Sequence, residues 1–316
     1  MSNFLQLLVN EQVKLYIRKS TWIMYILLGV IVIGLALLAS FEAEQTEKYQ
    51  SDNWRQTLKD ENAEIKEQMK EDDIMHDFST NQIEKNNFYL DNGIQPRSYD
   101  AWQFVLEHKF LLSLVSLFTI IVASGIIANE FKWGTIKLLL IRPITRTTIL
   151  ASKYVSVLLF ALFTLLFLLI FSWLVGALLF GVNGMDPQMV LNQTGEFTQV
   201  SIINQMAEGY GLQLITLVMM ATLAFMISAI FRQSSLAIGI AIFLMLSGSP
   251  IVSFLSEYSW AKYILFANTN MDQYINGSPL FEGMSLGFSI IVLAVYYVIF
   301  IAVTWTFFTK RDVAGH

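Results

Sequence analysis

The amino-acid sequence predicts an all-α, polytopic membrane protein. Of its 316 residues, 55% are hydrophobic and only 14% are charged, whereas soluble domains are about 25% charged. The apolar residues gather into long blocks, and a helix of about 20 such residues crosses the ~30 Å hydrocarbon layer of a bilayer. A helix also satisfies all of its own backbone hydrogen bonds in lipid. The two observations together predict transmembrane helices.

Six blocks are long enough to be spans. They cover residues 22–38, 110–128, 150–180, 212–231, 236–255 and 286–308. The fourth and fifth spans are separated by a tight connection at Arg232 and are expected to form an antiparallel hairpin. The first block is too long for the apolar core of a signal peptide, so we interpret it as a retained span.

The segments between the spans have different characters. Residues 1–21 show apolar side chains at helical spacing, including Leu7 and Leu15, which predicts a cytoplasmic amphipathic helix at the membrane interface. Residues 39–109 form the longest polar segment, and its apolar stripe, beginning at Trp54 and Leu58, predicts a helical extracytoplasmic domain. The remaining segments are a cytoplasmic coupling loop or helix, an extracytoplasmic loop, an extracytoplasmic or re-entrant segment and a cytoplasmic tail, at residues 129–149, 181–211, 256–285 and 309–316.

The distribution of lysine and arginine predicts the orientation. Residues 129–149 carry several basic side chains, whereas residues 181–211 carry none. Because cytoplasmic loops are enriched in lysine and arginine, both termini of this multi-pass membrane protein are expected in the cytoplasm.

Several classes of function are disfavoured. The chain has no cysteine and only three, widely separated histidines, so neither a catalytic residue nor a metal site is predicted. Nucleic-acid binding is not expected because basic residues are few and dispersed. The spans lack ionisable residues in their central parts, which disfavours a proton-driven carrier.

The loop after the second span has the most informative pattern. It contains Glu130, then Gly134 and Thr135, then an apolar run that ends at Pro143. A short amphipathic helix is predicted there, ended by the proline. Its basic residues hold it at the membrane surface, where it either docks a partner or is simply a positively charged loop.

The pattern Glu130-x3-Gly134-Thr135, followed by Leu139, Pro143, Arg146 and Lys153, resembles the first cytoplasmic loop of type-2 ABC transporter permeases. The resemblance implies that this loop is a coupling helix that docks into a separate ATPase. The ATPase-coupling residues that it implies are Glu130, Gly134, Thr135, Arg142, Pro143 and Arg146. Further ATPase-side contacts are expected at Glu11, Lys14 and Arg232.

The function expected from this resemblance is transport and not catalysis. The chain would be the permease subunit of an ATP-driven exporter for a hydrophobic or amphipathic substrate, namely a peptide antibiotic, a lipid or a drug, and so act in multidrug or antimicrobial peptide resistance. No P-loop motif occurs in the sequence, so ATP and magnesium are expected on the partner ATPase, with no cofactor in this chain.

A second permease subunit, identical or paralogous, is the other expected partner. The small residues Ala237, Gly239 and Ala241 allow close helix approach, either inside the chain or at a dimer seam. Two alternative functions remain open. One is a membrane sensor whose acidic outer domain binds cationic peptides, and the other is a secondary carrier.

Overall fold

A computed structural model describes residues 2–71, 76–135, 144–185, 187–193, 196–275, 277 and 279–310. The chain divides into two compact units. Unit 1 comprises Met1–Leu28, Phe110–Leu168 and Gly209–His316, and unit 2 comprises Gly29–Lys109 and Leu169–Glu208.

Six helical stretches are long and apolar enough to cross a membrane, as the sequence predicts. Most extend beyond the predicted bounds, because polar residues at their ends continue the helix past the apolar block. The six stretches are Lys19–Phe41, Ala101–Lys132, Arg146–Phe180, Ile202–Phe231, Ser234–Phe254 and Leu286–Lys310.

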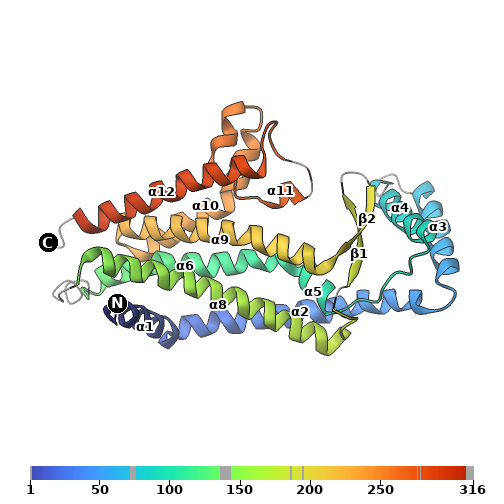
Figure 1. Ribbon diagram of the computed structural model, residues 1–316, viewed down its shortest axis with the longest axis horizontal. Helices are drawn as coiled ribbons and strands as arrows, with labels where there is room; N and C mark the ends of the chain where they lie inside the picture. Colours follow the sequence, from blue (N-terminus) through green and yellow to red (C-terminus); the bar gives the residue numbers. More distant parts are fainter. Residues whose placement is uncertain are drawn as a thin grey trace. The chain divides into compact units, whose positions relative to one another are not determined.

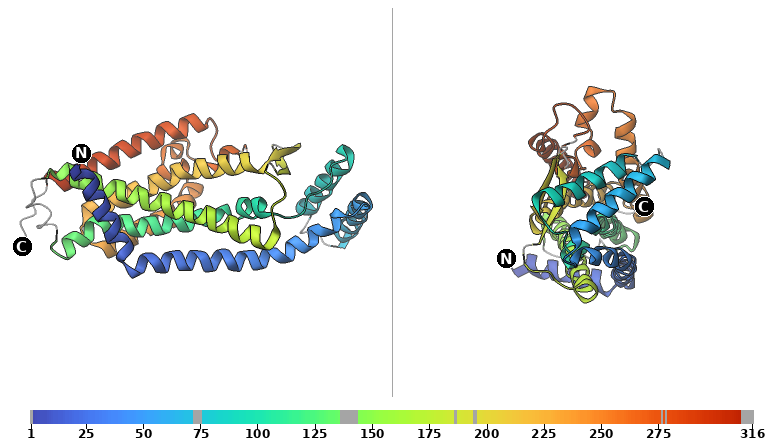
Figure 2. Two further views of the ribbon diagram at one scale, coloured as in Figure 1. Left: turned by 60° about the horizontal axis from the view of Figure 1, so that its bottom comes forward. Right: turned by 90° about the vertical axis from the view of Figure 1, so that its right-hand side faces the viewer.

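The N-terminal segment is helical but ends earlier than predicted. Helix α1 runs from Ser2 to Ile17 and α2 from Lys19 to Glu47. The chain changes direction between them (Figure 2), where the hydroxyl of Thr21 donates to the carbonyl of Leu15 at 2.6 Å. The break between the two helices thus precedes residue 21, while the start of the first span at residue 22 and the interfacial position of α1 stay predictions.

Helices α6 (Leu112–Lys132), α9 (Ile202–Phe231) and α10 (Ser234–Phe254) form the core of unit 1. They lie together in Figure 1. Ser228 of α9 donates its hydroxyl hydrogen to the carbonyl of Ser124 at 2.6 Å and accepts the N–H of Ala128 at 3.2 Å. These bonds join α9 directly to the backbone of α6.

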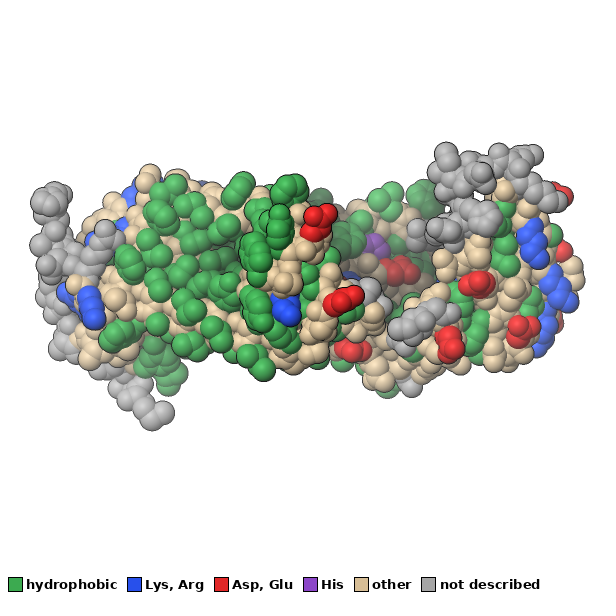
Figure 3. Space-filling model, turned by 90° about the horizontal axis from the view of Figure 1, so that it is seen from above, with side chains coloured by type: hydrophobic (Ala, Val, Ile, Leu, Met, Phe, Trp, Pro, Cys, Tyr) green, Lys and Arg blue, Asp and Glu red, His purple; other side chains and the backbone are tan. Residues whose placement is uncertain are grey.

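Helices α8 (Arg146–Phe180) and α12 (Leu286–Lys310) pack on this core. The hydroxyl of Tyr154 in α8 lies 2.7 Å from that of Thr222 and 3.3 Å from that of Tyr297. Hydrophobic side chains cover much of the face of unit 1 that Figure 3 shows. Exposed apolar residues of α10 and α12, such as Phe243 and Ile291, suit contact with lipid.

The segment between α10 and α12 contains short helices. They are η4 (Ser259–Tyr263), η5 (Leu265–Ala267) and α11 (Asp272–Ile275). Gly248 of α10 gives room for the ring of Phe266, because a Cβ at this glycine would lie 2.3 Å from that ring.

Unit 2 contains a pair of helices in the segment that the sequence predicts to be helical. Helix α3 spans Trp54–Glu71 and α4 spans His76–Asn92, and α3 buries Trp54 and Leu58 as the apolar stripe predicts. A short helix η1 (Lys48–Gln50) precedes α3, and α5 (Ala101–Glu107) and η3 (His108–Leu111) lead into α6.

Residues 181–211 are not the plain loop that the sequence led us to expect. They contain an antiparallel hairpin of β1 (Gln188–Gln193) and β2 (Glu196–Ser201), and α9 begins at Ile202. An isolated two-stranded hairpin is marginally stable. Here the rings of Phe197 in β2 and Phe88 in α4 lie 6.4 Å apart, so the hairpin has tertiary support that the sequence pattern does not show.

Candidate functional site

Helix α6 ends in a turn that explains the glycine of the Glu-x3-Gly-Thr pattern. Gly134 has a φ of 71°, in the left-handed region that suits glycine. The backbone N–H groups of Trp133 and Gly134 donate to the carbonyls of Asn129 at 2.9 Å and Phe131 at 3.1 Å. These bonds satisfy carbonyls that a helix end leaves open, so Gly134 is a helix stop.

The turn brings Thr135 back to Glu130. The threonine hydroxyl donates to Oε2 of the Glu130 carboxylate. Glu130 is only 7% exposed, so its carboxylate faces the interior of unit 1. Glu130, Gly134 and Thr135 therefore form one local structure.

The other oxygen of Glu130 joins a group of four charged side chains. Lys153 Nζ of α8 lies 3.0 Å from Glu130 Oε1 and 2.8 Å from Glu11 Oε2. Lys14 Nζ of α1 lies 3.0 Å from the same Glu130 oxygen and 2.9 Å from Glu11 Oε1. We call Glu11, Lys14, Glu130 and Lys153 the charge cluster. It joins α1, α6 and α8, and its formal charges sum to zero.

The charge cluster is largely shielded from solvent. Lys153 is 1% exposed and Glu11 5%, while the Lys14 side chain is at the edge. Burial alone lowers the pKa of Lys14, but Glu11 and Glu130 act against it and the net pKa is raised. Because removing one partner leaves an uncompensated buried charge, the cluster is stable only when it is complete.

The spacing of residues in α1 explains why Glu11 lies in the charge cluster. Leu7, Glu11 and Leu15 are four residues apart and therefore share one face of the helix, and all three are buried. The amide of Gln12 adds a hydrogen bond of 2.9 Å to the carbonyl of Ser156 in α8. The amphipathic face of α1 thus packs against the chain itself and carries a carboxylate into the contact.

Two arginines hold the aromatic residues beside the turn. The guanidinium of Arg18 lies 5.5 Å from the ring centroid of Trp133, and that of Arg232 lies 4.3 Å from the ring centroid of Phe131. Such cation–π contacts stabilise by about 0.5–2 kcal/mol. Arg232 lies in the short loop between α9 and α10 and has a φ of 54°. Its contact with Phe131 links this loop to the end of α6.

The structure places Arg146 apart from the charge cluster. Its Nη1 donates to the carbonyl of Thr309 at 2.8 Å, and Trp305 donates to the hydroxyl of Thr147 at 3.0 Å. The start of α8 is therefore joined to the end of α12. The predicted coupling segment, residues 129–149, is described in part: it includes the end of α6, the turn to Thr135 and the start of α8. Residues 136–143, with Arg142 and Pro143, lie outside the described residues.

The candidate dimer-seam residues do not share one environment. Ala237 and Ala241 are buried in the same core as Ile120 and Ala123 of α6, so these two small residues serve packing inside the chain. Gly239 is exposed, and a Cβ there would meet no atom within 4 Å. The close approach that the sequence suggests is thus found between α10 and α6.

Lys153 is a site residue that the sequence reasoning did not select. It belongs to the pattern that resembles type-2 ABC permeases, but no role was assigned to it there. In the structure it lies inside α8 and is neutralised by two carboxylates. The available signal was its position after the start of a long apolar block, because a lysine inside such a block needs a partner. The sequence does not show that one partner is Glu11, which is 142 residues away.

The described residues contain no group of histidine and carboxylate side chains that could hold a metal ion. The charge cluster joins the ends of α1 and α6 to the first turns of α8 through four ion pairs.

Comparison with known proteins places this chain among relatives without an assigned activity. The profile of the family described as "Protein of unknown function (DUF2705)" matches residues 74–314. The chain is similar to the "Uncharacterized protein YhcI" of Bacillus subtilis (strain 168), with 41% identity over 98% of this chain and 100% of that protein. It is also similar to the "Uncharacterized membrane protein YdbK" of the same organism, with 34% identity over 63% of this chain and 78% of that protein. The extent of these matches shows that the chain belongs to the DUF2705 family.

Proposed function

We propose that this chain is the membrane-spanning permease subunit of an ATP-driven exporter and that a separate ATPase docks at residues 129–149. The six span-length helices support a membrane protein. The resemblance of the Glu130-x3-Gly134-Thr135 pattern to type-2 ABC permeases supports the rest. In this proposal both termini are cytoplasmic, a second permease subunit completes the transporter, and the cargo is hydrophobic or amphipathic.

The charge cluster is the observation that best supports this function. A docked ATPase must transmit its motion to the membrane helices, which requires a stiff base beneath the docking loop. Thr135, at the start of the loop, is bonded to Glu130, and Glu130 is bonded to Lys14 of α1 and Lys153 of α8. A force applied at Thr135 therefore reaches three helices through short, charge-assisted contacts.

This geometry changes the role proposed for Glu130. Its carboxylate is engaged by Thr135, Lys14 and Lys153 within the chain, so it is a positioning residue beneath the docking surface. The surface itself is proposed to lie beyond Thr135, in the direction of Arg142.

Co-purification tests the function. We expect a tagged chain, isolated from its own bacterium in mild detergent, to retain a protein with a P-loop motif and to stimulate its ATP hydrolysis after reconstitution. A chain that purifies without an ATPase and moves substrate along an ion gradient would support the secondary carrier instead.

Cysteine labelling tests the orientation, and the chain has no native cysteine to interfere. An impermeant thiol reagent applied to intact cells should label a Lys66→Cys variant and leave a Lys132→Cys variant unlabelled. Labelling of Lys132→Cys in intact cells would contradict the cytoplasmic location of the loop.

A further inference from the structure

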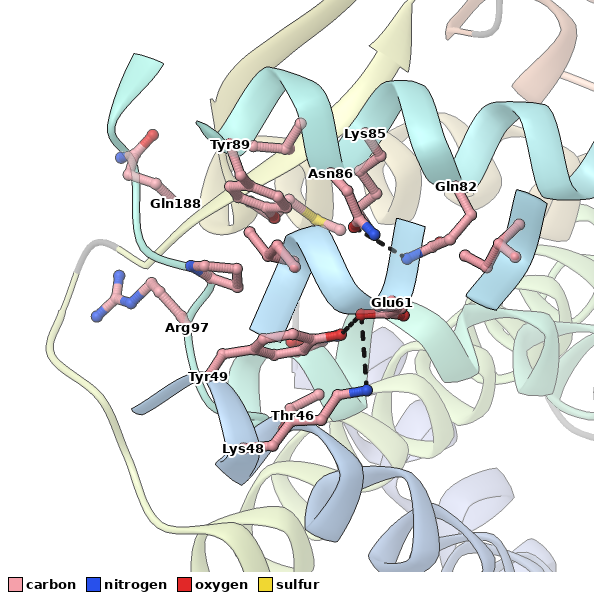
Figure 4. Close-up of a pocket in the computed structure, with 16 residues that line it drawn as sticks. Thr46, Lys48, Tyr49, Glu61, Gln82, Lys85, Asn86, Tyr89, Arg97 and Gln188 are labelled. Carbon is pink, nitrogen blue, oxygen red and sulfur yellow. Dashed lines mark hydrogen bonds and ion pairs between the residues drawn. The ribbon is translucent and has the colours of Figure 1, made fainter. Parts of the chain in front are cut away.

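Unit 2 contains a pocket of about 450 Å³ bordered by α3, α4 and β1. Figure 4 shows its lining, with Glu61 from α3 and Lys85 and Tyr89 from α4. This volume is within the range of about 300–1,000 Å³ that is typical of small-molecule sites. All of its lining residues belong to unit 2, and they are distant in sequence from the charge cluster.

The walls of the pocket are held together by hydrogen bonds. The amide of Asn62 in α3 donates to Asn87 at 3.0 Å and accepts from Asn86 at 2.9 Å. The backbone of Val190 in β1 bonds to the hydroxyl of Tyr89. The pocket is therefore largely formed before any ligand enters, which lowers the entropic cost of binding.

The carboxylate in this lining is already engaged. Glu61 accepts a hydrogen bond from the hydroxyl of Tyr49, and Lys48 Nζ lies 3.6 Å from the same oxygen, as the dashed lines in Figure 4 show. Arg97 donates to the carbonyl of Asn183, which is a neutral partner. The described lining therefore carries more positive charge than Glu61 can balance.

Lys85 is different from the other charged residues of the pocket. Its ammonium group makes no hydrogen bond or ion pair with any residue that the structure describes, although the side chain is half-buried. Burial lowers the pKa of Lys85, and the more distant Glu107 and Glu61 oppose this effect only in part. A half-buried ammonium group with open donor positions favours an anionic ligand.

We propose that this pocket binds a small organic monocarboxylate with an apolar body, and that Lys85 contacts the carboxylate. The apolar body would contact Leu58, Met189 and Val190, which also line the pocket. A monoanion fits better than a phosphate dianion because Glu61 lies close enough to Lys85 to influence it. A cation is disfavoured because Glu61 is already engaged by two donors.

Binding of three related probes tests the proposal. The full chain is placed in nanodiscs of zwitterionic lipid, with empty nanodiscs as the blank, and binding is followed by isothermal titration calorimetry. The probes are 3-phenylpropionate, its neutral amide 3-phenylpropanamide and the cation 3-phenylpropylamine. We expect saturable binding of the carboxylate, and binding of the amide and the amine that is at least about tenfold weaker, since losing a charged hydrogen bond has an effect of that size.

Variants of Lys85 identify the contact. Lys85→Gln should weaken 3-phenylpropionate about tenfold or more and leave the amide unchanged, whereas Lys85→Arg, which keeps the charge, should retain most of the affinity. Lys66→Gln is the matched control, because Lys66 is an exposed lysine of α3 that does not line the pocket. Thermal unfolding of each variant verifies that it is folded.

Three results would overturn the proposal. The first is that the amide or the amine binds as tightly as 3-phenylpropionate. The second is that folded Lys85→Gln binds 3-phenylpropionate as tightly as the unsubstituted protein does. The third is that a fourth probe, phenyl phosphate, binds more tightly than 3-phenylpropionate. None of these measurements involves an ATPase, so they test the pocket independently of the proposed transport function.

Discussion

Two lysines in this molecule are shielded from water, but one is paired with carboxylates and the other is not. Lys153 of α8 is almost fully buried and lies within 3.0 Å of two carboxylates. Lys85 of α4 is half-buried and makes no direct ion pair with a described residue. A buried charge is costly unless it is paired, so the first arrangement is complete as it stands. In our proposal, a bound carboxylate supplies the missing partner of the second.

This difference separates a structural lysine from a binding lysine. Replacing Lys153 removes a partner that two other residues need, whereas replacing Lys85 removes a charge that no described contact of the folded chain requires. Replacement by methionine is therefore expected to lower the thermal stability at Lys153 and to raise it slightly at Lys85.

The largest expected effect is that of Lys153→Met. The substitution leaves the carboxylates of Glu11 and Glu130 facing each other with only Lys14 at the edge of the cluster. Removing one partner of a buried ion pair destabilises proteins by about 3–5 kcal/mol. We expect a large loss of thermal stability in nanodiscs, measured by intrinsic fluorescence.

Lys132→Met is the matched control for Lys153→Met, because Lys132 is an exposed lysine at the end of α6. The double variant Lys153→Met with Glu130→Gln should recover part of the lost stability, since it leaves one balanced pair of Glu11 and Lys14. Equal stability of Lys153→Met and Lys132→Met would show that the cluster has no structural role.

A smaller effect is expected for Gly134→Ala, which tests whether the turn holds Thr135 against Glu130. The cost comes from the backbone, because φ is 71° and a Cβ would meet no atom within 4 Å. Forcing a residue with a Cβ into this region costs about 1–2 kcal/mol. Thermal unfolding measures the loss, and Gly211→Ala in α9, which has open space and no positive φ, should show none.

The smallest effects are the pH-dependent ones. Burial lowers the pKa of Lys85 below 10.5, the ordinary value for lysine. Below that lowered pKa the charged ammonium group destabilises the folded state. This destabilisation decreases as the pH rises toward 10.5. The pKa of Lys14 is raised by Glu11 and Glu130 despite burial. Its contribution is therefore fully present below pH 10.5 and is lost only as the pH rises through the raised pKa.

Melting temperatures measured between pH 8 and pH 11 compare these two lysines. Lys85→Met should melt slightly above the unsubstituted protein at pH 8, by about 1–2 °C, and the difference should shrink as the pH rises. Lys14→Met should melt below it, and this difference should persist to above pH 10. The reverse order at pH 8 would contradict the contrast between paired and unpaired lysines.

The sequence predicts much of the helical structure because its signals are local. The apolar blocks predict the six span-length helices, and the stripe that begins at Trp54 and Leu58 predicts the buried face of α3. Gly134 was selected by resemblance alone, but its role follows from an elementary rule, since a glycine after the last polar turn of a helix favours the left-handed cap.

The sites depend on contacts between distant parts of the chain. Glu11 and Lys153 meet although 142 residues separate them, and no local spacing indicates that pairing. The pocket requires β1, whose polar residues give only a weak strand pattern in the sequence. In the structure, contacts with α4 support the hairpin. Resemblance led us to Glu130 as a docking residue, whereas the structure shows its carboxylate engaged by Thr135, Lys14 and Lys153 within the chain.

The balance of the charge cluster has an electrical consequence. Moving one elementary charge through a membrane potential of 100 mV requires about 2.3 kcal/mol of work. Glu11, Lys14, Glu130 and Lys153 lie within about one side-chain length of one another and have no net charge. A motion that carries the four together through the field therefore requires almost no electrical work. Among these four residues, only a motion that separates the lysines from the glutamates would couple to the field.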